Sequence, residues 1–113
     1  MELKQLRKKL YAHVKLAVKD KLITVSESYT LRAIIGCTNI LGVSNARFES
    51  INNKRNMLAQ NATSMNAELV SYSTIKNHVR NLDKKLPWFS KEICFDGWKN
   101  NSTIIIDIKG LGL

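Results

Sequence analysis

A proline directly after an apolar stripe divides this chain into a helical part and a part with the period of a β-strand. The apolar positions repeat at intervals of four, three and four residues, at Ile75, Val79, Leu82 and Leu86. This is the pattern of a helix with one buried face. Pro87 follows at once, and a proline inside a helix removes a backbone donor and clashes with the preceding turn, at a cost of about 3 kcal/mol. With Ser71 as N-cap, the sequence predicts a helix over residues 71–86.

The residues after Pro87 indicate two strands. Segments 90–95 and 102–108 are rich in Ile, Phe and Thr and flank the polar segment 96–101. Two such segments around a polar connection are typical of a β-hairpin. The fold class predicted is therefore mainly α with a C-terminal β-hairpin, an α+β protein.

Three further helices are predicted before residue 71. Residues 2–21 have apolar positions at helical spacing, namely Leu3, Leu6, Leu10, Val14 and Ala17. Capping side chains at 24–27 precede a second apolar run over 29–41, which we interpret as a buried helix. A third helix is expected from residue 55 to about 68, and 42–54 is interpreted as mostly loop.

Length and composition favour a single globular domain over residues 1–113, because 44% apolar content supplies one core. Eighteen Lys and Arg against nine Asp and Glu give a net charge of +9, which favours a polyanionic partner without identifying it. Cys37 and Cys94 lie in apolar stretches and are expected to be buried thiols. No apolar run suggests export or membrane spanning, so a cytoplasmic location is expected.

The polar face of the helix over 71–86 lies opposite its apolar stripe. Its members can donate hydrogen bonds or carry positive charge: Ser73, Lys76, Asn77, Arg80 and Lys84. Such a face suits the major groove of DNA, because Arg pairs with guanine, Asn with adenine, and Lys with guanine or phosphate. Any surface helix also has a polar outer side. The neighbouring elements are therefore needed to distinguish a DNA-binding face from an ordinary solvated one.

Two groups beside this helix are predicted to contact phosphates. The first group is Ser71, Tyr72 and Ser73, at the start of the helix, where backbone N–H groups attract anions. The second is Lys99, Asn100 and Asn101, at the tip of the hairpin. Helix, helix, turn, helix and hairpin follow one another in the order that a winged helix-turn-helix requires.

The segment Val70-Ser71-Tyr72-Ser73-Thr74-Ile75-Lys76-Asn77-His78-Val79-Arg80-Asn81-Leu82 resembles the recognition segment of winged-helix DNA-binding proteins of bacterial plasmids and phages. Many of these are replication initiators or small regulators, and the resemblance covers roughly residues 24–108. It implies a winged helix-turn-helix, preceded here by the extra helix within 1–22, that binds specific double-stranded DNA. Transcriptional regulation is the favoured role, and origin binding in plasmid or phage replication is the alternative. A protein-interaction or RNA-binding structural module is the alternative of another class.

The basic N-terminal helix has three possible uses, of which the first two are favoured. It can pack on its own domain, pair with its copy in a homodimer through residues 2–21, or lie on a membrane surface. Seven basic and two acidic side chains between residues 1 and 22 also allow contact with a phosphate backbone.

No motif for catalysis, a metal or a cofactor is evident in the sequence, so a non-enzymatic protein is expected. The two histidines, His13 and His78, have no Cys, Asp or Glu at a helical ligand spacing. We expect His78, which flanks the apolar stripe, to be partly buried and hydrogen-bonded. The acidic residues are scattered and do not form a cluster that would hold Mg²⁺ for nuclease chemistry.

Overall fold

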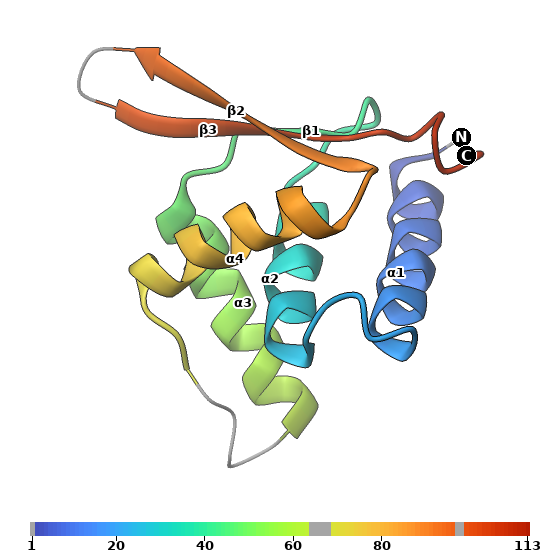
Figure 1. The fold of residues 1–113 in the computed structure, drawn as a ribbon, viewed down its shortest axis with the longest axis horizontal. Helices are drawn as coiled ribbons and strands as arrows, with labels where there is room; N and C mark the ends of the chain where they lie inside the picture. The colour runs from blue at the N-terminus through green and yellow to red at the C-terminus, as the bar shows by residue number, and fades with distance from the viewer. Residues whose placement is uncertain (1, 64–68, 97–98) are drawn as a thin grey trace.

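The structure, a computed structural model, describes residues 2–63, 69–96 and 99–113; the side chains of 62–63, 72, 92–96 and 99–102 lie outside that description. The elements in chain order are α1 (Leu3–Lys19), α2 (Val25–Ile35), β1 (Val43–Ser44), α3 (Phe48–Thr63), α4 (Tyr72–Lys85), β2 (Phe89–Asp96) and β3 (Lys99–Ile106). The described part is thus mainly helical with a small antiparallel sheet (Figure 1). This confirms the predicted α+β class.

Helix α1 confirms the prediction for residues 2–21, since it buries Leu6, Leu10, Val14 and Ala17. Helix α2 begins at a capping box, in which the Thr24 hydroxyl accepts from the Glu27 N–H at 3.1 Å and Glu27 accepts from the Thr24 N–H at 2.9 Å. These two bonds satisfy backbone donors that a helix start leaves open.

The prediction that the second helix continues to residue 41 is wrong, because α2 ends at Ile35 and Leu41 is 73% exposed. The hydroxyl of Thr38 donates to the Ile35 carbonyl at 2.7 Å, which satisfies one of the carbonyls left open at a helix end. Cys37, expected to be buried, is half-buried in this turn. Cys94 has a side chain outside the description.

Asn39 and Gly42 build the turn that leads into β1. The Asn39 side-chain oxygen accepts from the N–H groups of Leu41 and Val43, at 2.9 and 3.1 Å. Gly42 has φ +80°, and a Cβ there would lie 2.4 Å from the Ile106 carbonyl oxygen. Only glycine fits such an approach, so the turn brings β1 alongside β3.

Helix α3 begins at Phe48, so the prediction of mostly loop over 42–54 is wrong for residues 48–54. The inward positions of its first turns are Phe48, Ile51, Arg55 and Ala59, all of them buried. Their spacing is helical, but a charged residue, Arg55, occupies one inward position and is 1% exposed. The buried arginine therefore hid the period. The predicted end near residue 68 lies outside the described residues.

Helix α4 matches the predicted helix over 71–86, with Ser71 as N-cap and Leu86 as C-cap. Leu86 has extended backbone angles, as expected for a residue before proline. Beyond Pro87, β2 and β3 pair as the predicted hairpin, and β1 joins the other edge of β3 to give the order β1-β3-β2. The strands extend further toward the tip than predicted, because Asp96 pairs with Lys99. Most of the segment 96–101 is therefore strand.

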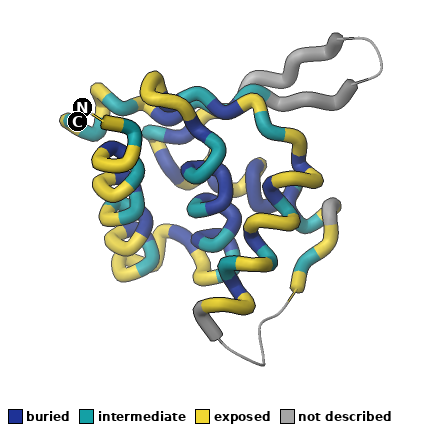
Figure 2. The backbone as a smooth tube through the Cα atoms, turned by 180° about the vertical axis from the view of Figure 1, so that it is seen from behind, coloured by how far each residue is buried: buried dark blue, intermediate teal, exposed yellow. Residues whose placement is uncertain are grey.

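The sheet lies along one side of the helices, and α2 occupies the centre of the helical layer (Figure 1). Contacts join α2 to α1, α3 and α4, and join α4 to β2. Figure 2 shows the buried positions concentrated on the inner sides of these elements. The central helix therefore connects α1 on one side with α4 on the other.

Candidate nucleic-acid interface

Helix α4 has a fully buried side and a polar outer side. Ile75, Val79, Leu82 and Leu86 are all buried in the core, as predicted. On the other side Ser73, Asn77, Arg80 and Lys84 are exposed, and Lys76 is half-exposed. The structure thus brings all five predicted residues of the polar face to the surface of one helix.

The N-terminus of α4 carries no side-chain cap. Ser71 occupies the N-cap position, but its side chain makes no capping bond; its hydroxyl oxygen lies 3.3 Å from that of Thr74. The first turn also has no acidic residue. The N-cap side chain therefore satisfies none of the backbone donors at the start of this helix, a position that attracts anions. The side chain of Tyr72 lies outside the described part.

A pair of hydrogen bonds fixes the chain where it enters α4. The Asn56 amide nitrogen donates to the Val70 carbonyl at 3.2 Å, and the Val70 N–H donates to the Asn56 amide oxygen at 3.1 Å. Asn56 lies on α3 and Val70 directly precedes Ser71. This pair holds the start of α4 on α3, and no pattern in the sequence predicts it.

Two polar contacts join α4 to α2 beneath the outer face. The Thr30 hydroxyl lies 2.7 Å from Nδ1 of His78, and the Lys85 ammonium lies 2.8 Å from a carboxylate oxygen of Glu27. His78 is buried and hydrogen-bonded, as predicted. Glu27 is also buried; its place in the capping segment predicted a helix start and not an ion pair.

Burial and the neighbouring groups shift the pKa values of His78 and Glu27. Burial lowers the pKa of His78, although the nearby Glu27 carboxylate acts in the opposite direction. Burial alone would raise the pKa of Glu27. The bonds from Lys85 and Thr24 outweigh burial, so the pKa of Glu27 lies below its ordinary value. His78 is therefore favoured in its neutral form and Glu27 in its charged form.

The hairpin projects beyond the helical part of the molecule, on the side away from α1 (Figure 1). Lys99, Asn100 and Asn101, predicted as tip residues, form the first part of β3 opposite Asp96, Phe95 and Cys94. Their side chains lie outside the description. The backbone places all three in the distal part of the projecting hairpin.

Helix α1 uses its apolar stripe within its own domain, the first of the three predicted uses. Leu6, Leu10, Val14 and Ala17 belong to the same core cluster as the buried side of α4. Arg7 also donates to the Thr38 carbonyl at 2.9 Å. A homodimer through residues 2–21 would therefore have to use the outward side of α1.

Within the described ranges, no group of three or more His, Cys, Asp and Glu side chains could hold a metal ion. No helix in that part of the chain is both long enough and apolar enough to cross a membrane.

No family model matches the chain, and neither the curated proteins nor the solved structures give a significant match.

Proposed function

We propose that this protein binds specific double-stranded DNA as a winged helix-turn-helix, with α4 in the major groove and the β2–β3 hairpin as the wing. The observation that carries the proposal is the outer side of α4. Four polar or cationic side chains, Ser73, Asn77, Arg80 and Lys84, are exposed on a helix whose opposite side is fully buried. Their chemistry suits base edges and phosphates.

The arrangement around α4 supports this proposal. Helix α4 is held by α3 through Asn56, by α2 through Thr30 and Glu27, and by the strand that follows it. A groove-reading helix has to be held rigidly, because base readout depends on positions fixed to within about 0.5 Å. The hairpin projects from the same part of the molecule (Figure 1), where a wing can contact the backbone beside the groove.

A regulatory role is the more specific proposal, with a plasmid, phage or other mobile element as the source of the operator. It rests on the resemblance of the segment Val70–Leu82 to recognition segments of such proteins. Selection of bound duplexes from a random library, followed by selection from fragments of the source genome, tests both levels. Enrichment of promoter-proximal sites supports regulation. Enrichment of a replication origin would replace regulation with the origin-binding alternative.

The decisive variant is Arg80→Ala, measured on the selected duplex. If Arg80 reads a guanine, the variant loses about 1–3 kcal/mol of binding free energy and relaxes the preference at one base pair. Lys19→Ala is the matched control, because Lys19 is an exposed cation at the end of α1. Unchanged duplex affinity in Arg80→Ala would remove α4 from the interface. Equal affinity for duplex RNA would favour the RNA-binding alternative.

A further inference from the structure

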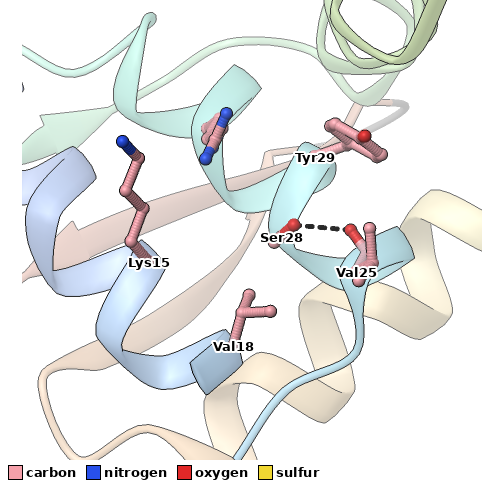
Figure 3. A pocket seen from close by; sticks show the side chains of 6 residues that line it. Lys15, Val18, Val25, Ser28 and Tyr29 are labelled. Carbon is pink, nitrogen blue, oxygen red and sulfur yellow. Dashed lines mark hydrogen bonds between the residues drawn. The ribbon is translucent and has the colours of Figure 1, made fainter. Parts of the chain in front are cut away.

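A pocket of about 200 Å³ lies between α1 and α2, and no residue of α4 lines it. Its lining residues are Lys15, Val18, Val25, Ser28, Tyr29 and Arg32. Figure 3 shows Lys15 and Val18 on α1, and Val25, Ser28 and Tyr29 on the neighbouring helix α2. The pocket uses no residue of the proposed DNA interface, so it requires an explanation of its own.

Positive charge enters the pocket from both helices. Lys15 comes from α1 and Arg32 from α2, and no carboxylate lines the pocket. Neither cation forms an ion pair with any residue that the structure describes. Both cations line the same pocket, where an anion would supply acceptors for their charged groups.

The remaining wall is largely apolar. Val18, Val25 and Tyr29 contribute hydrocarbon and aromatic surface. The guanidinium of Arg55 lies 5.6 Å from the centre of the Tyr29 ring, which favours one position of the ring through a cation–π contact. The Ser28 hydroxyl donates to the Val25 carbonyl (Figure 3). Tyr29 and Ser28 therefore have partners of their own, and they lie beside the aliphatic surface of Val18 and Val25.

Volume and chemistry together define the ligand class. Pockets for drug-sized ligands occupy about 300–1,000 Å³, so a pocket of about 200 Å³ suits a smaller molecule. We propose that this pocket binds a small organic carboxylate, with its carboxylate between Lys15 and Arg32 and its apolar body against Val18, Val25 and Tyr29. A benzoate-sized aromatic or branched aliphatic acid fits this description.

The helix dipole of α2 accounts for only one of the two cations in the pocket. Arg32 lies in the last turn of α2, where a cation also interacts favourably with the helix dipole. Lys15 lies within α1 and gains nothing from that end of α2. The helix dipole also does not explain why no acidic side chain lines the pocket. Two cations from separate helices beside a shared apolar wall therefore point to an anionic ligand with an apolar part.

The test is a titration of the full chain, labelled with ¹⁵N, with sodium benzoate, followed by the amide signals in two-dimensional NMR spectra. We expect saturable shifts at Val18, Ser28 and Tyr29 with a Kd on the order of 1 mM. Benzamide, which has the same shape without the charge, should bind at least about tenfold more weakly. Absence of saturable shifts up to about 20 mM benzoate would overturn the proposal, whatever the outcome of DNA binding.

Two variants and a second anion separate this site from nonspecific charge. Lys15→Gln and Arg32→Gln should each raise the Kd for benzoate about tenfold, while Lys84→Gln on α4 should leave it unchanged. Lys15 is exposed, so its replacement keeps the fold. If inorganic phosphate binds as tightly as benzoate, the apolar wall contributes nothing and the carboxylate proposal is wrong. If Lys84→Gln weakens benzoate binding as much as the two pocket variants do, the loss reflects net charge alone and the proposal is likewise wrong.

Discussion

The hydroxyl of Thr30 lies 2.7 Å from Nδ1 of His78, and this contact joins the central helix α2 to the underside of α4. Both residues are buried, with 0% of Thr30 and 8% of His78 exposed. Water therefore offers little compensation if the bond is lost. The proposed reading side of α4 thus depends on a polar contact inside the core as well as on apolar packing.

Replacement of Thr30 by valine should destabilise the fold while keeping the size of the side chain. Thr30→Val leaves Nδ1 of His78 buried without this partner, which costs about 1–3 kcal/mol. The measurement is the free energy of unfolding in urea. His78→Phe and the double variant complete a cycle, in which the coupling between the two residues should be about 0.5–3 kcal/mol. Additive effects of the two substitutions would show that the contact does not stabilise the protein.

The stability of the protein should fall as the pH falls below about 6.5, the ordinary pKa of histidine. Burial lowers the pKa of His78 in the folded protein, so the unfolded chain binds the proton more readily. The contribution of His78 is therefore present above the unfolded pKa and is lost as the pH falls toward the folded pKa. Glu27, whose folded pKa is also lowered, loses its contribution in the same direction at more acidic pH, below about 4.5.

Urea unfolding measured between about pH 8 and pH 5 tests this effect. His78→Phe should remove most of the decline near pH 6, and His13→Gln, a change to the other histidine, should retain it. The groups that act on His78 are Glu27, Arg55 and Lys85, and none of them is changed in either variant. An equal decline in wild type and His78→Phe would assign the pH dependence to other groups.

Replacement of Asn56 by alanine should loosen the start of α4. The side chain of Asn56 makes both hydrogen bonds that hold the Val70 backbone, so Asn56→Ala removes an acceptor from the Val70 N–H and a donor from its carbonyl. Amide hydrogen exchange at Val70 should become at least about tenfold faster. Asn53→Ala, an exposed amide on the same helix, is the control and should change nothing. Unaltered protection of the Val70 amide would show that other contacts hold this segment.

The elements with an uninterrupted apolar period were predictable from the sequence. Leu6, Leu10 and Val14 define α1, and the stripe before Pro87 defines α4. Helix α3 was missed at its start because its inward positions include Arg55, whose burial depends on partners such as Ser26, 29 positions away. A buried charge has the same appearance in a sequence as a solvated one.

The polar contacts beneath α4 could not be predicted for a related reason. Thr30 and His78 are 48 positions apart, and Glu27 and Lys85 are 58 apart. Periodicity reports which side of a helix is buried, but it carries no information on which residues of two helices meet. The outer side of α4 was predictable because exposure follows directly from the buried stripe. The contacts that hold α4 on α2 were not predictable, since they depend on how the two helices cross.

Salt dependence should separate contact with a phosphate backbone from nonspecific attraction of a basic chain. If DNA docks on α4 with the hairpin beside it and about five phosphates are contacted, log K for the selected duplex should fall with log salt at a slope of roughly −4 to −5. Lys84 is exposed on α4, so Lys84→Ala should lower the magnitude of the slope by about 1. Lys19→Ala should leave the slope unchanged, because α1 lies on the side of the molecule away from the hairpin (Figure 1). Fluorescence anisotropy from about 50 to 200 mM salt measures all three slopes. A larger change in Lys19→Ala than in Lys84→Ala would place the duplex on α1 and would contradict the proposed orientation.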